Sequence, residues 1–527
     1  VQIGDPITQK MMFDFLLEAR DRGLYTAITD NGAGGLSSSV GEMAEAAGGA
    51  QLDLSKAPLK YTGLAPWEVF LSEAQERMTL AVDPEHVEEL LELARRREVE
   101  ASVLGRFSDD GYLEVRWGNE VVGLLDMGFL HGGVPEMRLE ARWKRRRFDE
   151  PRLRSTDLDA TLLDLLARLN LTSNETKARH YDHEVKGLAV VRPFVGVGSD
   201  IPAEATVFLA RHGSLRGFVL SEGINPFLSD IDAEAMAATV VDEAVRRQLC
   251  AGARIDRIAA LDNFCWPDPV ASEGTPDGAY KLAQLVRACR GLYDTCLAYG
   301  VPLISGKDSM KNEAVLGGIK IPVPPTLLVS AIGQIDDVRE SLTLDFKQPG
   351  DVVFLLGETG AHTGGSEYYR YLGARDGQIA IPGSPSPYVG NDVPTLDPDL
   401  TFPLYRAFHE AIRSGLVRSA ATPGKGGLAV ALARSAMAGG LGASLSLDND
   451  ELPVDIALFS ESNGRFVVTT AVQDAAPFEA TLDGLPYRRL GSVTSAGELI
   501  VEWRGERVIH VGVDDLQCSF KKGLADA

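Results

Sequence analysis

Residues 302–311, PLISGKDSMK, combine several side chains that could bind a phosphorylated ligand. An apolar stretch ends here at a glycine, Gly306, and is followed by the cation Lys307, the carboxylate Asp308 and the hydroxyl Ser309. A glycine lets the backbone approach phosphate, a lysine supplies charge, and an aspartate is a hard oxygen ligand for Mg²⁺. The P-loop pattern GxxxxGK[ST] is absent, so the residues alone leave open a nucleotide site and an ordinary polar turn.

Two glycine-rich loops, residues 32–35 and 424–427, each stand at the predicted start of a helix. Free N–H groups and the positive end of the helix dipole favour an anion at such a position. Glycines that permit close helix packing are the alternative interpretation, and the residues alone favour it.

Residues 72–77, SEAQER, bring two carboxylates, an amide and a guanidinium together at the end of an apolar stretch. These groups could hold a polyhydroxylated, phosphorylated substrate. They could equally form an internal ion-pair network, and the segment alone does not decide between the two.

Other chemical signals are weak. His180 and His183 have a spacing that could serve a metal, but no set of Cys or Glu residues joins them, and structural roles are favoured. Five cysteines show neither CxxC spacing nor an even disulfide framework, which favours a reducing compartment. None stands in a recognisable nucleophile context, so an embedded glutaminase is not expected.

The composition is that of an intracellular enzyme, with 45% hydrophobic and 24% charged residues in 527 residues. Such a length predicts roughly three to four domains. The net charge of −23 argues against nucleic acid or an anionic membrane as the main partner. The basic run at residues 142–147 is interpreted as a solvated linker. No stretch approaches the length of a membrane-spanning helix, and cytoplasm is the expected location.

One passage of the sequence occurs twice. The dipeptide Asp5-Pro6 recurs as Asp397-Pro398, and residues 32–35 recur as residues 424–427 at the same spacing. Residues 72–77 recur as residues 460–465, and the number of positions that separates the two copies is almost the same as for the first two matches. Landmarks that keep their register over such a distance indicate two domains of one fold.

The late copy is preceded by residues 350–392, which contain a predicted first strand and an active-site loop at residues 363–367. The early copy has no counterpart, because the chain starts too late to include one. In addition, Val1 is not an initiator methionine. We therefore expect these residues to be the C-terminal part of a longer polypeptide.

Hydrophobic periodicity predicts a mixed α/β protein built on antiparallel hairpins rather than on regular βαβ units. Helices are expected over residues 10–22, 88–97, 158–170, 233–251 and 278–299. Strands are expected in a hairpin, 112–117 with 120–125, and over 189–197, 205–209, 217–220, 257–260, 301–305, 326–335 and 351–357.

Five motifs resemble, in this order, those of phosphoribosylformylglycinamidine synthase, a purine-biosynthesis amidotransferase of the aminoimidazole ribonucleotide synthetase superfamily. The motifs are QIGDP at 2–6, DNGAGGL at 30–36, SEAQERM at 72–78, YDH at 181–183 and SGKDS at 305–309. The resemblance covers nearly the whole chain.

The resemblance implies an α/β (α+β) fold of duplicated N-type and C-type domains, with antiparallel sheets packed against helices. Residues 1–140 would be the first C-type domain without its N-terminal strand and loop, and residues 141–185 a linker. Residues 186–345 would be the second N-type domain, 346–515 the second C-type domain, and 516–527 a tail. The family's catalytic histidine belongs to the first N-type domain, so no catalytic residue is assigned in this chain.

Site residues follow from the matching motif positions. The resemblance implies substrate binding at Glu73, Ala74, Gln75 and Ser309, and nucleotide binding at Gly306, Lys307, Asp262 and Asn263. It implies metal binding at Asp5, Asp308 and Glu243. Arg247 replaces the asparagine expected one helical turn after Glu243, which puts that auxiliary metal site in doubt.

The implied reaction is the ATP- and Mg²⁺-dependent amidation of formylglycinamide ribonucleotide to formylglycinamidine ribonucleotide through an iminophosphate. Ammonia would come from glutamine on a separate glutaminase subunit, with a small accessory subunit and the chain's own N-terminal part as further partners. Two alternatives remain, a non-catalytic nucleotide-binding scaffold and another ATP-using synthetase of the superfamily. An N-type domain without its partner also predicts an exposed sheet surface within residues 186–345.

Overall fold

The computed structural model describes residues 4–151, 154–181, 183–375, 389–447 and 451–524. The chain forms two compact units, Val1–Arg138 and Leu139–Ala527. In the described part of the chain, none of the helices combines the length and the apolar character needed to cross a membrane.

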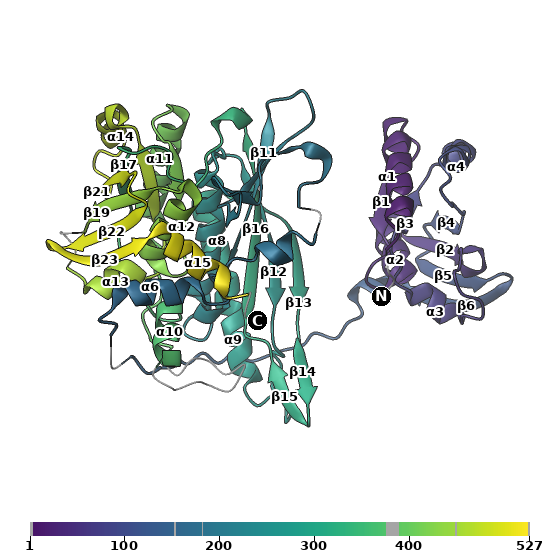
Figure 1. Cartoon of the computed structure of the whole chain (residues 1–527). Coiled ribbons are helices and arrows are strands. Elements are labelled where there is room, and N and C mark those ends of the chain that lie inside the picture. The colour runs from purple at the N-terminus through teal and green to yellow at the C-terminus, as the bar shows by residue number, and fades with distance from the viewer. Residues whose placement is uncertain (1–3, 152–153, 182, 376–388, 448–450, 525–527) are drawn as a thin grey trace. The chain divides into compact units, whose positions relative to one another are not determined.

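The first unit packs helices against two small sheets (Figure 1). A four-stranded sheet has the order β4-β2-β5-β6, and β1 pairs with β3. The predicted hairpin is confirmed as β5 and β6. The elements of this unit are α1 (Pro6–Asp21), β1 (Ala27–Asp30), α2 (Gly35–Ala47), β2 (Gly49–Asp53), α3 (Pro66–Leu71), β3 (Met78–Ala81), α4 (Val87–Arg96), β4 (Gly105–Ser108), β5 (Tyr112–Trp117), β6 (Glu120–Asp126) and α5 (Met127–Gly132).

The duplicated Asp-Pro dipeptide begins a helix in both copies. Asp5 is the N-cap of α1 and accepts a hydrogen bond from the N–H of Ile7 at 3.3 Å. Asp397 is likewise the N-cap of α11 (Pro398–Arg413) and accepts from the N–H of Asp399 at 3.0 Å. A proline at the first helical position needs no hydrogen-bond acceptor for its nitrogen, so the dipeptide is a helix-start signal.

The second unit contains a six-stranded sheet of order β13-β12-β16-β11-β10-β7. All neighbouring strands are antiparallel except β12 and β13, which are parallel. Two long helices, α8 (Ala233–Cys250) and α9 (Gly278–Tyr299), match the predicted helices closely. The strands are β7 (Ala189–Val191), β10 (Thr206–Leu209), β11 (Gly217–Ile224), β12 (Ile258–Cys265), β13 (Leu303–Ser309) and β16 (Thr326–Ile335).

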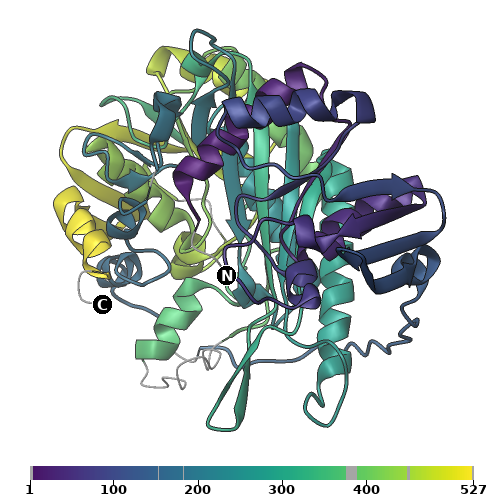
Figure 2. The same cartoon turned by 90° about the vertical axis from the view of Figure 1, so that its right-hand side faces the viewer.

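The two helices pack on one face of this sheet. Ala260, Val329 and Ala331 point into their shared core. On the other face, Leu220 and Ile332 each keep 40% of their surface exposed, in agreement with the expected exposed sheet surface. A hairpin, β14 (Glu313–Leu316) and β15 (Ile319–Pro322), extends beyond the sheet in both Figure 1 and Figure 2.

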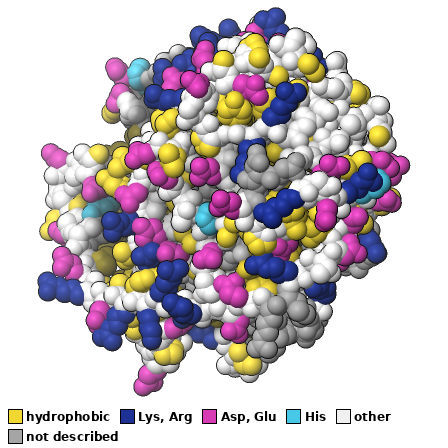
Figure 3. All heavy atoms as spheres, turned by 90° about the vertical axis from the view of Figure 1, so that its left-hand side faces the viewer, with side chains coloured by type: hydrophobic (Ala, Val, Ile, Leu, Met, Phe, Trp, Pro, Cys, Tyr) yellow, Lys and Arg dark blue, Asp and Glu magenta, His cyan; other side chains and the backbone are white. Residues whose placement is uncertain are grey.

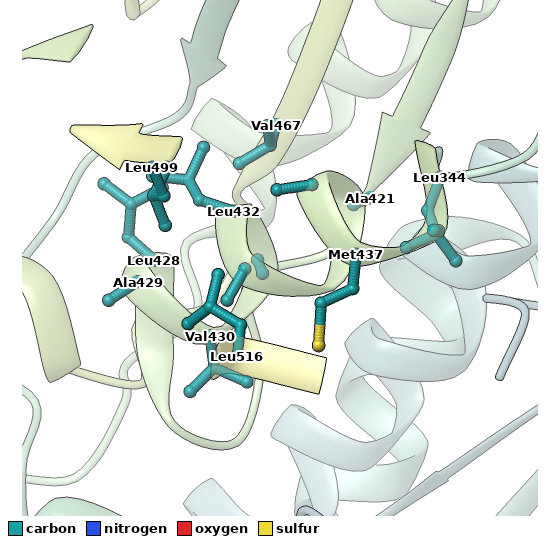
Figure 4. Packing of buried hydrophobic residues seen from close by; sticks show 14 of the residues in the cluster. Leu344, Ala421, Leu428, Ala429, Val430, Leu432, Met437, Val467, Leu499 and Leu516 are labelled. Carbon is teal, nitrogen blue, oxygen red and sulfur yellow. The ribbon is translucent and has the colours of Figure 1, made fainter. Parts of the chain in front are cut away.

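A seven-stranded sheet of order β18-β20-β17-β21-β19-β22-β23 forms the rest of the second unit. The buried helix α12 (Gly427–Gly439) packs against it, and Figure 4 shows Leu428, Leu432 and Met437 of this helix among side chains from β20, β22 and α15. The elements of this part are β17 (Val352–Leu356), α10 (Glu367–Arg375), α11, β18 (Ser419–Ala421), α12, β19 (Gly442–Ser446), α13 (Val454–Phe459), β20 (Phe466–Thr470), α14 (Ala475–Thr481), β21 (Tyr487–Thr494), β22 (Glu498–Trp503), β23 (Glu506–Gly512) and α15 (Val513–Lys522).

Two segments expected to be a linker and a tail contribute to this core. Helix α6 (Leu158–Leu166) buries Leu162 and Leu165, and α15 buries Leu516 and Phe520. All four side chains belong to the same hydrophobic cluster. The described parts of the two segments are therefore integral to the second unit.

The basic run at residues 142–147 is also more than a solvated linker. Trp143 stacks on Tyr280 of α9 with ring centroids 5.4 Å apart. Arg146 lies 4.0 Å from the Tyr280 centroid, and Arg287 lies 4.6 Å from the Trp143 centroid. Alternating cations and rings attract one another, so the run is fixed across α9. Elsewhere on the surface, Figure 3 shows a face on which acidic and basic side chains are interspersed.

Candidate functional site

The predicted nucleotide residues meet at the edge of the six-stranded sheet. In the parallel pairing of β12 with β13, Asp262 lies beside Gly306, Asn263 beside Lys307, and Cys265 beside Ser309. A Cβ atom on Gly306 would stand 2.9 Å from the Asp262 carboxylate oxygen Oδ1. Residues 44 positions apart in the sequence therefore lie side by side at this strand edge, and a larger side chain at Gly306 would displace the Asp262 carboxylate.

Strand alternation divides these residues between the two faces of the sheet. Asp262, Gly306 and Asp308 follow the face of Phe264, which packs towards α9. Asn263, Lys307 and Ser309 follow the opposite, open face. The sequence motif thus separates a pair of carboxylates from a cation and a hydroxyl.

The two carboxylates influence one another. Burial raises the pKa of Asp262, and the negative charge of Asp308 raises it further. Burial likewise raises the pKa of the Cys289 thiol on α9, with Asp308 and Asp262 adding to the effect. Two carboxylates that repel each other at a strand edge gain from a shared cation, so they have the donor chemistry that Mg²⁺ prefers.

In the first unit, the glycine loop packs directly against the start of residues 72–77. Gly35 has φ of 56°, and a Cβ atom on it would come within 2.3 Å of the Ser72 carbonyl oxygen. Arg77 Nη2 donates to that same carbonyl at 2.5 Å. Close packing, the favoured alternative, is therefore what these glycines provide.

This backbone arrangement presents the predicted substrate residues outwards. Glu73 and Gln75 are exposed, and the intervening Ala74 is half-buried. The N–H of Ala74 donates to the carbonyl of Asn31 at 3.3 Å, which holds the segment to the glycine loop. Asp5, the predicted metal ligand of this unit, is exposed, and the hydroxyl of Thr8 holds the pKa of its carboxyl below the usual value.

The late copy repeats this architecture. A Cβ atom on Gly427 would come within 2.7 Å of the Ser460 carbonyl oxygen, and Arg465 Nη2 donates to that carbonyl at 2.7 Å. The structure thus confirms that residues 30–77 and 422–465 are copies of one local fold.

Glu461, the counterpart of Glu73, is buried instead of exposed. Its Oε1 accepts hydrogen bonds from the N–H of Gly426 at 2.8 Å and from the N–H of Glu367 at 2.9 Å, at the starts of α12 and α10. Burial raises the pKa of Glu461 to about 7. The anion position at the late glycine loop is therefore occupied by the protein's own carboxylate.

Glu243, the predicted auxiliary metal ligand, forms an ion pair with Arg247 in this structure. Arg247 Nη2 lies 2.8 Å from Glu243 Oε1, and Arg247 Nη1 lies 2.6 Å from Glu222 Oε1. Burial alone would raise the pKa of the Glu243 carboxyl, but Arg247, with Lys425 and Arg246, holds it below the usual value. Arg247, which replaces the expected asparagine, provides the positive charge that a metal ion would otherwise supply to Glu243.

The remaining candidates are structural. The ring of His183 stacks edge-on against Phe194, with centroids 6.3 Å apart, and its Nδ1 lies 3.0 Å from the Tyr181 carbonyl. All five cysteines are free thiols. Among the described residues, no three His, Cys, Asp or Glu side chains come together as a metal site.

Sequence reasoning missed the burial of Glu461 and the ion pairs of Arg247. The position of Glu461 in the duplicated block marks it as a functional candidate. Its burial does not follow from the sequence, because the two N–H groups that donate to it belong to residues 35 and 94 positions away.

The domains define the class of protein first. Residues 1–118 and 348–504 match the AIR synthase related protein C-terminal domain, and residues 216–335 match the corresponding N-terminal domain. The chain is therefore built from AIR synthase related domains, with the C-type domain present twice.

Relatives narrow the class to one family. The chain is 33% identical over 539 residues to phosphoribosylformylglycinamidine synthase subunit PurL of Alkaliphilus metalliredigens, covering 99% of this chain and 67% of the relative. It is 33% identical over 536 residues to the same subunit of Deinococcus radiodurans, covering 99% and 68%. The chain belongs to the phosphoribosylformylglycinamidine synthase subunit PurL family, as its motifs predict.

The fold agrees with solved structures of that family. "T. maritima PurL complexed with ADP" superposes with a TM-score of 0.64 at 21% identity, over 93% of this chain and 68% of the other. "T. maritima PurL complexed with FGAR" gives 0.63 at 20% identity, over 94% and 66%. The chain spans about two thirds of the length of the curated relatives it matches.

Proposed function

We propose that this chain takes part in the ATP-dependent amidation of formylglycinamide ribonucleotide to formylglycinamidine ribonucleotide in purine biosynthesis. The observation that carries the proposal is the β12–β13 edge, where Asp262, Gly306 and Asp308 lie together in a domain of this family. A glycine beside two carboxylates at an exposed strand edge is suited to a nucleotide carried with Mg²⁺.

Each residue has a proposed task. Asp262 and Asp308 would hold Mg²⁺, which when bound neutralises charge on the transferred phosphoryl group. Gly306 leaves room for the Asp262 carboxylate, and Lys307 with Asn263, on the opposite and open face, would contact an anionic part of the nucleotide away from the carboxylate pair. Ser309 would orient the acceptor.

The first unit carries the proposed substrate residues. Glu73 and Gln75 are exposed on a segment held by backbone hydrogen bonds, so they are free to contact the ribose hydroxyls and the amide. Asp5 is proposed as an oxygen ligand for Mg²⁺ within the first unit. We propose no metal-binding role for Glu243, because Arg247 pairs with it.

The late copy supports a structural role for its own C-type domain. Glu461 fills the anion position of its glycine loop, and Arg247 neutralises Glu243. We therefore propose that turnover involves the early copy, and that the late copy maintains the fold.

Further partners are part of the proposal. The chain spans about two thirds of its relatives' length, and we propose that full activity requires a further segment that carries the catalytic histidine. Ammonia would come from a separate glutaminase subunit, with a small accessory subunit in the complex, and the location would be cytoplasmic.

The test is phosphate release from ATP with formylglycinamide ribonucleotide and ammonium, using the chain alone and then with an N-terminal segment from a relative. The proposal would be supported if the mixture is active, if Lys307→Gln reduces that activity about tenfold or more, and if the surface variant Lys522→Gln preserves it. Nucleotide binding without turnover in either preparation would instead favour a scaffold.

A further inference from the structure

A cavity of about 440 Å³ lies in the second unit, away from the β12–β13 edge. It is open to solvent on one side and is lined by residues that follow α6, by α10, by Phe227 and by a residue that follows α15. The lining residues are Ala167, Arg168, Leu169, Asn170, Phe227, Glu367, Arg370 and Gly523. Of these residues, only Glu367 belongs to a predicted functional segment, the loop at residues 363–367.

One carboxylate of this cavity is fully satisfied by two neighbours. Glu367 is 1% exposed. Its Oε2 accepts from Arg168 Nε at 2.7 Å, and its Oε1 accepts from Asn170 Nδ2 at 2.6 Å. A buried carboxylate is stable only when paired and hydrogen-bonded in this way, so Glu367 neutralises Arg168.

A second cation of the cavity lacks an equivalent partner. Arg370 Nε lies 3.7 Å from Glu367 Oε1, which is too far for a hydrogen bond. This Nε is buried and makes no hydrogen bond within the part of the chain that the structure describes. The guanidinium lies 3.7 Å from the centroid of Phe227, and a ring face does not accept the in-plane N–H groups.

The electrostatic balance of the cavity is therefore positive. Burial lowers the pKa of the Arg370 guanidinium, and the neighbouring charge of Arg168 lowers it further, against the opposite effects of Glu367 and Glu461. Glu461 is already engaged by two backbone N–H groups. Two arginines and one carboxylate that is already paired leave a charge that an incoming anion would balance.

We propose that this cavity binds a small oxyanion, either inorganic phosphate or the phosphate of a small phosphomonoester, between Arg168 and Arg370. Guanidinium groups offer paired N–H donors that match the spacing of phosphate oxygens. The site is partly removed from water, which strengthens such contacts, and its volume leaves room for a short organic group. The proposal does not depend on the proposed function.

The test is calorimetric titration of the intact chain with inorganic phosphate at low ionic strength, with glycerol 3-phosphate in parallel. Arg370→Gln is expected to raise the Kd for phosphate by about tenfold or more, since it removes a charged donor. The matched control Arg339→Gln removes an exposed arginine paired with Asp337 outside the cavity and should leave the Kd unchanged. Tighter binding of glycerol 3-phosphate would identify a phosphomonoester as the ligand, and equal or weaker binding would identify free phosphate.

A second pair of variants keeps the proposal testable if Arg370→Gln does not fold. Arg370→Lys retains the charge but loses the paired donors, so severalfold weaker binding is expected. Lys307→Gln tests whether phosphate binds at the nucleotide site instead, and the exposed Lys522→Gln, outside the cavity, should leave phosphate affinity unchanged. Phosphate binding that responds to Lys307→Gln but to neither Arg370 variant would overturn the proposal, as would no binding at millimolar phosphate.

Discussion

At the scale of single residues, the raised pKa of Glu461 gives this protein a stability that depends on pH. The carboxyl is protonated more readily in the folded chain, with a pKa of about 7, than in the unfolded chain. Its contribution is therefore complete below the ordinary pKa of a glutamate and is lost as the pH rises towards 7. Across that interval we expect a loss of about 3 kcal/mol in the free energy of unfolding.

Replacing Glu461 with glutamine should remove this dependence. The amide oxygen can still accept from the N–H groups of Gly426 and Glu367, but the side chain no longer titrates. Urea unfolding of the wild type and of Glu461→Gln at several pH values between 5 and 7.5 would measure the difference. The exposed Glu506→Gln should follow the wild type, and parallel curves for Glu461→Gln and the wild type would contradict this account.

The carboxylate pair of the nucleotide site also predicts an effect at this scale. Asp308→Asn removes a charge that raises the pKa of Asp262 and removes one oxygen anion for Mg²⁺. We expect ATP binding in the presence of Mg²⁺ to weaken about tenfold or more, while binding without Mg²⁺ improves because repulsion of the phosphates falls. Equal affinities with and without Mg²⁺ in the wild type would show that Asp308 does not hold a metal.

At the scale of elements, the duplicated glycines allow the stability cost of close packing to be compared with the cost of a left-handed backbone alone. Gly427 and Gly415 have φ of 72° and 71°, but only Gly427 would place a Cβ atom against backbone atoms, at 2.7 Å. Gly415→Ala should cost about 1 kcal/mol of unfolding free energy for the left-handed backbone alone. Gly427→Ala should cost several kcal/mol, since a buried helix start must move.

The early copy provides the replicate of this experiment. Gly35 and Gly23 repeat the contrast, with 2.3 Å to the Ser72 carbonyl oxygen at Gly35 and nothing within 4 Å at Gly23. Thermal unfolding of all four alanine variants would measure it. If the two alanine variants of each pair had equal stability, close packing would not explain the glycine loops.

How far the sequence predicts this structure varies with the element. Helices α8 and α9 were located within about one residue because both are long, with Asp232 as the N-cap of α8 and Gly300 as the C-cap of α9. Helix α15 has only ten residues and a polar sequence, and contacts with α6 and α12 bury its apolar side. The sequence predicts the residues of the β12–β13 edge but not which face of the sheet each side chain takes, because the faces follow from the register of two strands that are distant in the sequence. The position of Glu461 depends on the starts of α12 and α10, and no local sequence pattern indicates that these two helix starts lie close together.

At the scale of the whole molecule, the two copies of the C-type domain have the same backbone plan but different chemistry. In the early copy, Glu73 and Gln75 are exposed beside the glycine loop. In the late copy, Glu461 is buried on the helix starts, and in the N-type domain that precedes it Arg247 pairs with Glu243. A duplicated fold therefore keeps its packing residues in both halves, while the charges of the late half are neutralised internally.

This asymmetry predicts that the chain binds one nucleotide rather than two. The chain has one AIR synthase related N-terminal domain, residues 216–335, with one β12–β13 edge, and the late copy has no free anion position at its glycine loop. Titration with Mg²⁺ and a non-hydrolysable ATP analogue should give a stoichiometry near one, which Lys307→Gln abolishes and Glu461→Gln leaves intact. A stoichiometry of two, with one site lost in Glu461→Gln, would mean that the late copy opens to a ligand despite its internal ion pairs. The structural role assigned to the late half would then have to be abandoned.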